Sequence, residues 1–218
     1  MLNNQPRLLK FAMPSVTSRL HEGSADILGI SALSKDTPLV LQDAWFSLFQ
    51  LRGTDIPAAV AKGWIDYGLC GLDAIVETQA QVSILREFPQ TATKISLIER
   101  PRREDTPTAD SYLVVTEYPV ITRTHLEKRY SDLSIWKAHG ACESFAFLDD
   151  VDGVVDIVDT GDTLSRNGLV VREVLFETCI CLVGGYALDP VDPDEFLTET
   201  RRKVQSLKAF ARARKGSQ

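Results

Sequence analysis

Residues 152–168 read Asp-Gly-Val-Val-Asp-Ile-Val-Asp-Thr-Gly-Asp-Thr-Leu-Ser-Arg-Asn-Gly. The nearly continuous β-branched run from Gly153 to Asp159 is typical of a strand that is buried on both faces. The chain then turns through a glycine, and a helix can start at Leu164. This stretch therefore predicts a strand–turn–helix unit in which Asp156 and Asp159 lie near the C-terminal end of the strand.

Strand and helix patterns alternate on both sides of this unit, so the sequence predicts an α/β protein. Strands are expected at residues 8–14, 39–41, 46–51, 66–71, 111–116, 133–137 and 175–183. Helices are expected at residues 24–29, from a Thr54 or Asp55 cap to Gly63, from residue 72, at 121–128, and from residue 192 onward. The charged, proline-rich stretch 99–107 is interpreted as an exposed connection and a first hinge.

Composition and charge argue against several classes of function. The chain has 218 residues and a formal net charge of −6, so binding to nucleic acid is not expected. No apolar run approaches the roughly 20 residues that a membrane span needs. The four cysteines are scattered and lack a second Cys or His pair, which argues against a metal site built from a side-chain cluster. We expect a cytoplasmic protein with reduced, mostly buried thiols.

The turn after the predicted strand can bind an anion. A glycine turn aims consecutive backbone N–H groups at one point, and Thr160 and Thr163 add hydroxyl donors, which suits a phosphate monoester. Neighbouring carboxylates can accept hydrogen bonds from sugar hydroxyls or help to hold Mg²⁺ through water. Taken alone, the same residues also fit an ordinary strand–turn–helix junction in which Asp and Thr are caps.

The stretch resembles the phosphoribosyl-diphosphate loop of the ATP phosphoribosyltransferase family, whose pattern is Asp-x-Ile-Val-Asp-x-Val-x-Thr-Gly-x-Thr-Leu. Four further segments match the family in order over most of residues 8–185. They are Gly140-Ala141-Cys142-Glu143, Tyr118-Pro119, Leu51 to Pro57, and Ile65 to Asp73. The chain lacks room for the regulatory extension of the long form, so it resembles a divergent member of the short form.

The resemblance implies a two-domain, type II periplasmic-binding-protein-like fold with the active site in a cleft. One domain would comprise residues 1–102 and 186–218, and the other residues 103–185. The implied reaction transfers a 5-phosphoribosyl group from phosphoribosyl diphosphate to N1 of ATP, with Mg²⁺, in the first step of histidine biosynthesis. The implied partners are further copies of the chain, in a homodimer or higher oligomer, and a regulatory subunit similar to histidyl-tRNA synthetase.

Site residues follow from the same motifs. The resemblance implies catalytic roles for Glu143, Asp156 and Arg52. It implies binding of phosphoribosyl diphosphate by the loop and its flanking carboxylates: Asp152, Asp156, Asp159, Thr160, Gly161, Asp162, Thr163 and Leu164. It implies nucleotide or phosphate binding by a third set: Arg19, Arg52, Gly71, Asp73 and Lys94. Magnesium would be bound together with the substrate.

Some basic positions depart from the family pattern. The phosphate-binding Leu-Pro-Lys-Gly-Arg-Leu segment becomes Met13-Pro14-Ser15-Val16-Thr17-Ser18-Arg19-Leu20, which is two residues longer and keeps only Arg19. Thr54 replaces an arginine, Lys94 stands where the family has one, and Asp162 adds a negative charge to the loop. Two alternatives therefore stay open: a phosphoribosyltransferase with another acceptor or donor, and a non-catalytic binding subunit on the same fold.

Overall fold

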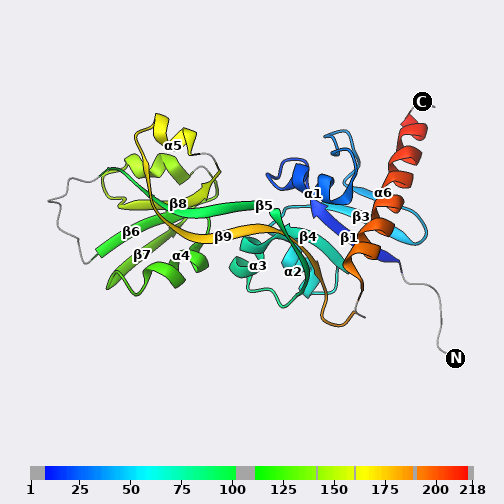
Figure 1. The fold of residues 1–218 in the computed structure, drawn as a ribbon, viewed down its shortest axis with the longest axis horizontal. Helices are drawn as coiled ribbons and strands as arrows, with labels where there is room; N and C mark the ends of the chain where they lie inside the picture. Colours follow the sequence, from blue (N-terminus) through cyan, green and yellow to red (C-terminus); the bar gives the residue numbers. More distant parts are fainter. Residues whose placement is uncertain (1–7, 102–110, 141, 160, 189–190, 216–218) are drawn as a thin grey trace. The chain divides into compact units, whose positions relative to one another are not determined.

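The computed structural model describes residues 8–101, 111–140, 142–159, 161–188 and 191–215, with side chains up to residue 209. The chain folds into two compact units. Unit 1 consists of Met1–Thr91 and Ile180–Gln218, and unit 2 of Ala92–Cys179. The predicted α/β class is confirmed, because each unit combines a β-sheet with helices (Figure 1).

In unit 1 the strands follow the order β2-β3-β1-β4-β9, and only residues 180–184 of β9 belong to this unit. The strands are β2 (Val40–Gln42), β3 (Phe46–Leu51), β1 (Leu9–Pro14), β4 (Tyr67–Gly71) and β9 (Val170–Gly184). Strand β1 is central and runs parallel to β3 and β4, whereas β2 and β9 are antiparallel to their neighbours. Phe11, Ala12 and Met13 are fully buried, as expected for a central parallel strand covered on both faces.

Four helices belong to unit 1: α1 (His21–Leu28), α2 (Ile56–Ala61), α3 (Leu72–Thr78) and α6 (Pro193–Lys215). Helix α1 begins three residues before the predicted start and ends at Gly29, whose φ of 59° is left-handed. Helix α6 packs against α1 and β2. Its apolar side chains at helical spacing, Leu197, Val204 and Leu207, join the core formed by Phe11, Met13 and their neighbours.

In unit 2 the strands follow the order β5-β8-β6-β7, and only residues 92–99 of β5 belong to this unit. The strands are β5 (Ser83–Glu99), β8 (Gly153–Val158), β6 (Ser111–Thr116) and β7 (Asp132–Lys137). Strand β8 is antiparallel to β5 and parallel to β6, and β6 is parallel to β7. Helix α4 (Pro119–Leu126), the 3₁₀ helix η1 (Cys142–Phe147) and helix α5 (Asp162–Arg166) complete the unit.

Strand β8 confirms in part the prediction of a strand that is buried on both faces. Gly153, Val154 and Val155 are buried, whereas residues 156–158 are half-buried, so burial on both faces holds for the first half of the strand. A side chain at position 153 would place its Cβ atom 2.6 Å from the hydroxyl of Tyr112, so only glycine fits there. The half-buried second half of the strand carries Asp156, one of the candidate site residues.

The passages between the two units lie inside long strands. The chain passes from unit 1 to unit 2 within β5 and returns within β9. The sequence interpretation placed a hinge at 99–107, but Glu99 ends β5 and residues 102–107 lie outside the described residues. The predicted domain bounds at 102 and 186 stay a prediction.

The three tryptophans lie at the surface of this chain. Trp45, Trp64 and Trp136 are 53%, 64% and 53% exposed, so none of them belongs to the core of this chain. All four cysteines are buried, and none of them forms a disulfide bond. Among the described residues, no helix combines the length and the apolar character needed to cross a membrane.

Candidate functional site

The first group of predicted residues lies where β8 ends. Gly161 adopts a left-handed φ of 75° and precedes α5, so the helix begins at Asp162 rather than at Leu164. Leu164 is buried in the core of unit 2 and anchors the turn. The N–H groups of the first turn of a helix have no partners inside the helix, so this turn offers backbone donors to an anion.

The side chains around this turn differ in exposure. Asp162 and Thr163 are exposed, and the amide of Ser165 donates to the carbonyl of Gly161 at 3.0 Å. We call residues Asp159 and Gly161–Leu164 the unit 2 loop. Thr160, which was also predicted to bind phosphoribosyl diphosphate, lies outside the described residues.

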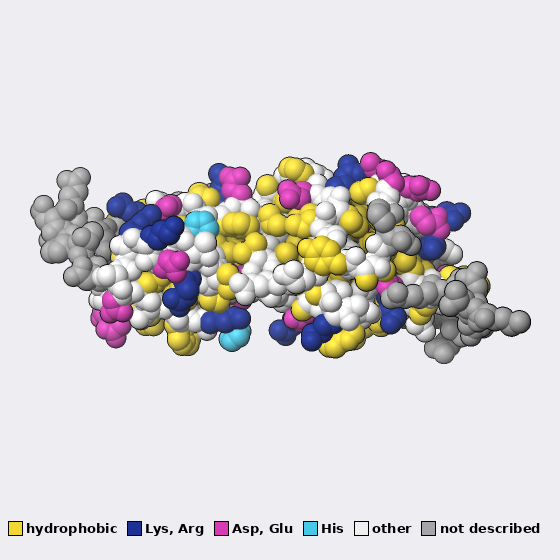
Figure 2. Space-filling view, turned by 90° about the horizontal axis from the view of Figure 1, so that it is seen from below, with side chains coloured by type: hydrophobic (Ala, Val, Ile, Leu, Met, Phe, Trp, Pro, Cys, Tyr) yellow, Lys and Arg dark blue, Asp and Glu magenta, His cyan; other side chains and the backbone are white. Residues whose placement is uncertain are grey.

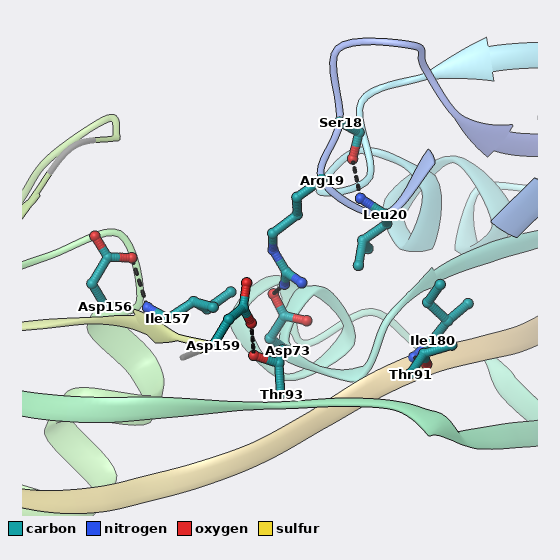
Figure 3. A network of polar contacts seen from close by, with 10 residues as sticks. All are labelled: Ser18, Arg19, Leu20, Asp73, Thr91, Thr93, Asp156, Ile157, Asp159 and Ile180. Carbon is teal, nitrogen blue, oxygen red and sulfur yellow. Dashed lines mark hydrogen bonds and ion pairs between the residues drawn. The ribbon is translucent and has the colours of Figure 1, made fainter. Parts of the chain in front are cut away.

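Asp156 is fixed by two backbone donors. Its Oδ1 accepts the N–H of Ile157 at 2.7 Å (Figure 3). Its Oδ2 accepts the N–H of Cys142 in η1 at 3.3 Å. Burial raises the pKa of Asp156, and the charge of Glu143 raises it further. The two backbone donors lower this pKa, but by less. The structure thus places Glu143 and Asp156, two predicted catalytic residues, near enough for the charge of one to affect the pKa of the other.

Strand β5 supplies further groups beside the end of β8. The hydroxyl of Thr93 donates to Oδ1 of Asp159 (Figure 3). Lys94 pairs with Val158 and Ser96 pairs with Asp156 in the antiparallel register. Because side chains of residues directly opposite each other share a face of the sheet, Lys94 lies on the same face as Asp156, one diagonal step away. Sequence analysis missed Thr93, although it directly precedes Lys94.

Asp152 is not brought together with the loop. It precedes β8 at the opposite end of the strand, where its carboxylate accepts the N–H of Leu113 at 2.8 Å and its own amide donates to the carbonyl of Leu113 at 3.0 Å. The six residues of β8 separate it from Asp159 by roughly 20 Å. Its position fits a role in pinning β8 to β6.

The second group lies in unit 1, at the ends of its parallel strands. Strands β1, β3 and β4 end at Pro14, Leu51 and Gly71, and each is followed by a predicted site residue. Open α/β sheets bind ligands at this carboxyl edge. We call Arg19, Arg52, Gly71 and Asp73 the unit 1 edge.

Arg19 and Asp73 form the best-defined contact of the unit 1 edge. Nη2 of Arg19 lies 3.1 Å from Oδ2 of Asp73, with 39% of the arginine side chain and 7% of the aspartate side chain exposed (Figure 3). Gly71 makes room for this carboxylate, because a Cβ atom at position 71 would lie 2.1 Å from Oδ1 of Asp73. The buried aspartate therefore orients an arginine that remains accessible to an anion.

Arg52 lies in the turn that follows β3. Its carbonyl accepts the N–H of Asp55 at 2.9 Å, and its side chain is exposed. A Cβ atom at the adjacent Gly53 would lie 3.6 Å from both Leu20 and Ser18, so this turn adjoins the loop that carries Arg19. The structure thus brings Arg19 and Arg52 to the same edge of unit 1, whereas Lys94 belongs to unit 2.

Charge on the surface is mixed rather than concentrated. On the face shown in Figure 2, acidic and basic side chains lie interspersed. Within the described ranges, no group of three or more His, Cys, Asp and Glu side chains could hold a metal ion. Local donors, and not a broad positive field, must therefore attract an anionic ligand on this face.

Solved structures share the fold. A chain of the ATP phosphoribosyl transferase (HisG:HisZ) complex from Thermotoga maritima matches with a TM-score of 0.67 and 23% identity over 92% of this chain and 96% of that one. A putative binding component of an ABC transporter from Wolinella succinogenes, complexed with lysine, matches with a TM-score of 0.52 and 10% identity over 91% and 90%. The protein is thus of the class of two-domain α/β proteins with a type II periplasmic-binding-protein-like fold.

Sequence comparison identifies the family within this class. The sequence pattern of the ATP phosphoribosyltransferase family matches residues 52–206. The ATP phosphoribosyltransferase of Dictyoglomus thermophilum is 30% identical over 88% of this chain and 94% of its own length. That of Pyrococcus furiosus is 30% identical over 90% and 98%. The chain belongs to the ATP phosphoribosyltransferase family, and it is a pentosyl-transferring enzyme.

Proposed function

We propose that the protein transfers the 5-phosphoribosyl group of phosphoribosyl diphosphate to N1 of ATP and releases diphosphate, as the first step of histidine biosynthesis. Family membership supports the reaction. The observation that carries the assignment to particular residues is the turn after β8. There, a left-handed Gly161 starts α5 beside the carboxylates of Asp156 and Asp159.

We assign the donor substrate to the unit 2 loop. The amides of the first turn of α5 and the hydroxyl of Thr163 are suited to bind the 5-phosphate. Asp156 and Asp159 are suited to accept hydrogen bonds from the ribose hydroxyls. Two backbone amides hold Asp156, and the hydroxyl of Thr93 holds Asp159, so both carboxylates are oriented before substrate arrives.

We assign phosphate groups of the nucleotide or of the departing diphosphate to the unit 1 edge. Arg19 and Arg52 are exposed cations on adjoining loops that follow β1 and β3. The ion pair with Asp73 holds the guanidinium of Arg19 by one nitrogen, which leaves further N–H donors for phosphate. Lys94 in unit 2 contributes a point charge without the fork of an arginine.

The reaction needs little acid–base chemistry. N1 of adenine attacks with a lone pair and has no proton to lose, so no general base is required. Bond breaking at the anomeric carbon creates an oxocarbenium-like state, which nearby carboxylates such as Glu143 and Asp156 stabilise. Negative charge grows on the diphosphate at the same time, and Arg52 stabilises it. The protein thus acts by positioning and electrostatics.

Magnesium fits this site as an ion that arrives with the diphosphate. Asp159 is exposed at the end of β8, and the described residues hold no cage of three or more ligands. One or two carboxylates together with substrate oxygens and water are the usual ligands of Mg²⁺ in such sites. When bound, the ion neutralises part of the diphosphate charge. Asp159 and Asp162 are the residues that we propose to hold it.

We further propose a cytoplasmic assembly of several copies of the chain with a regulatory subunit similar to histidyl-tRNA synthetase. The solved relative from Thermotoga maritima is described as a HisG:HisZ complex, which supports such a partner. The half-exposed Trp45 and Trp136 and the more exposed Trp64 are surface aromatics that suit protein contacts.

The test is diphosphate release by the purified chain with phosphoribosyl diphosphate, Mg²⁺ and ATP, while the absorbance of the N1-ribosylated adenine is followed. The assay is run with and without a candidate regulatory subunit. Turnover that is lost in Asp156→Asn and kept in the surface variant Lys35→Ala supports the assignment. Binding of phosphoribosyl diphosphate without product in either mixture would refute ATP as the acceptor and direct the search to other bases or to a binding-only role.

A further inference from the structure

The loop between β1 and α1 presents Arg19, and the loop is built from short-range contacts. The amide of Ser18 donates to the carbonyl of Ser15 at 2.8 Å, and the amide of His21 donates to the carbonyl of Ser18 at 3.0 Å. Among the described backbone hydrogen bonds, only one joins this loop to another strand, and it lies at the first residue of the loop. In it, the amide of Ser15 donates to the carbonyl of Leu51 at 2.7 Å. Such successive turns leave the direction of the loop poorly fixed unless its two ends are joined.

The imidazole of His21 joins those ends. Its Nδ1 lies 2.8 Å from the carbonyl oxygen of Pro14, the last residue of β1. Its Nε2 lies 3.0 Å from the backbone nitrogen of Leu33, beyond the end of α1. The ring is 4% exposed, so water does not substitute for either partner.

The two partners determine the tautomer of His21. The N–H of Leu33 can only donate, so Nε2 must accept and carry no proton. The carbonyl of Pro14 can only accept, so Nδ1 must carry the proton and donate. The ring is therefore a neutral bridge with one donor and one acceptor, and each nitrogen has a separate task.

We propose that His21 is a positioning residue for substrate phosphate, which acts by holding the loop of residues 15–20 so that Arg19 points toward Asp73 and the unit 1 edge. This inference rests on the proposed phosphate-binding role of Arg19. The bond from Nδ1 to Pro14 closes the loop, whereas the bond to Nε2 secures the segment after α1.

Two substitutions separate these tasks. In His21→Asn, the amide nitrogen replaces Nδ1 and keeps the donor to Pro14, while the bond to Leu33 is lost. In His21→Gln, the amide oxygen replaces Nε2 and keeps the acceptor for Leu33, while the bond to Pro14 is lost. Each variant leaves one buried backbone group without its partner, so similar losses of thermal stability are expected. His125→Gln is the matched control, because the Nδ1 atom of His125 contacts Ile121 within its own helix and its ring is exposed.

The expected kinetic result is a split between KM and kcat. First, Arg19→Ala identifies which substrate loses affinity, phosphoribosyl diphosphate or ATP. For that substrate, His21→Gln should raise KM by at least about fivefold, because the arginine contact to phosphate weakens. His21→Asn should keep KM within about twofold of the wild-type value, because this variant loses only the hydrogen bond to Leu33 and keeps the one to Pro14. The kcat of both variants should change little.

Hydrogen exchange provides a readout that does not depend on activity. The amides of Ser18, Leu20 and His21 should exchange faster in His21→Gln than in the wild type and in His21→Asn. Equal exchange in the two variants, or equal KM increases, would overturn the positioning role. If the wild type shows no turnover, the proposed function fails, but the exchange pattern, together with titration of inorganic diphosphate into the wild type and both variants, still decides the role of His21.

Discussion

The carboxylate of Asp73 occupies the space that a side chain at position 71 would need. The Cβ atom of an alanine at this position would lie 2.1 Å from Oδ1 of Asp73 and 3.3 Å from Leu20. The neighbouring carboxylate oxygen, Oδ2, contacts Arg19. The lack of a side chain at Gly71 therefore determines where the carboxylate of Asp73 lies, and with it the position of the ion pair that Asp73 forms with Arg19.

Gly71→Ala should accordingly displace Asp73 and weaken binding of the phosphate-bearing substrate. We expect KM to rise by roughly tenfold, comparable to the loss of one charge-assisted contact. Steady-state kinetics with each substrate varied in turn measures this change. Gly185→Ala is the control, because its Cβ atom would meet neighbours at 3.7 Å or more. A Gly71→Ala enzyme with unchanged KM would contradict the proposed role of this edge.

Gly161→Ala should weaken binding of phosphoribosyl diphosphate through the backbone of the unit 2 loop. Its φ of 75° costs an alanine about 1 kcal/mol, and the turn should change shape to relieve this strain. Gly168→Ala offers a matched comparison, because its φ is 66°, its surroundings are open and it lies at the other end of α5. Both variants should lose a similar amount of thermal stability. Calorimetric titration with phosphoribosyl diphosphate should nevertheless show weaker binding for Gly161→Ala only.

The activity of the enzyme should fall on the acid side at a higher pH than an ordinary aspartate would cause. Burial, and then the charge of Glu143, raises the pKa of Asp156, so this carboxyl group binds a proton as the pH falls and can no longer accept from two hydroxyls. Glu143→Gln removes the second cause. The acid limb of the kcat/KM profile should therefore move to lower pH in this variant, whatever its absolute rate. If the acid limb of the profile stays at the same pH in Glu143→Gln, protonation of Asp156 does not cause the loss of activity.

The same shift predicts how stability depends on pH. A carboxyl group whose pKa is higher in the folded state stabilises the protein below its unfolded pKa, near 3.9 for aspartate, and this stability is lost as the pH rises through the folded value. At neutral pH, the ionised and partly buried Asp156 is therefore a cost to folding. Asp156→Asn should raise Tm at pH 7 and abolish activity, and the gain in Tm should shrink toward pH 4. Thermal unfolding at both pH values tests this.

The cysteines should be unreactive in the native protein. Burial, and then the charge of Asp156, raises the pKa of the Cys142 thiol to about 12, and burial with the charge of Asp73 raises that of Cys70. Thiolates are the reactive species, so the native protein should react with a disulfide reagent at least about a hundredfold more slowly than the denatured protein. Counting thiols by absorbance before and after denaturation checks this, and rapid reaction of any native thiol would contradict it.

Helix α6 should stabilise unit 1 through Arg201. Its Nε donates to the carbonyl of Leu28, at the C-terminal end of α1, at 2.7 Å, and its guanidinium covers Gly29. Arg201→Ala should lower the free energy of unfolding by about 1 kcal/mol, measured by urea denaturation. The adjacent Arg202 pairs only with Glu199 on the surface among its described contacts, so Arg202→Ala should leave stability unchanged within error.

Local patterns of residues predicted many of the helices and strands, but not all of them. The β-branched run at 153–158 and the alternation at 46–51 correspond to β8 and β3, because burial of a strand imposes its own pattern of side chains. Glycine positions predicted the ends of α1 and α2 for a similar local reason. By contrast, the 17-residue β5 was not predicted, because exposed, half-buried and buried residues mix over 83–94 without a continuous apolar signal.

The candidate site could be predicted only as a list of residues. Asp156, Glu143 and Lys94 are far apart in the sequence, and their proximity follows from the register of β5 with β8 and from η1. Asp152 belongs to the same motif as Asp156, yet the length of β8 carries it to the other end of the sheet. Thr93 was missed because nothing in the order of residues shows which hydroxyl will meet Asp159.

The sequence by itself determined the α/β class, the strand–turn–helix unit and the family, because buried strands, glycine turns and short motifs are written in neighbouring residues. The tertiary structure decided which side chains cooperate: the ion pair of Arg19 with Asp73, the closure of its loop by His21, and the raised pKa of Asp156. Each of these depends on burial or on partners that local patterns do not bring together, and both arise only when the chain folds and excludes water.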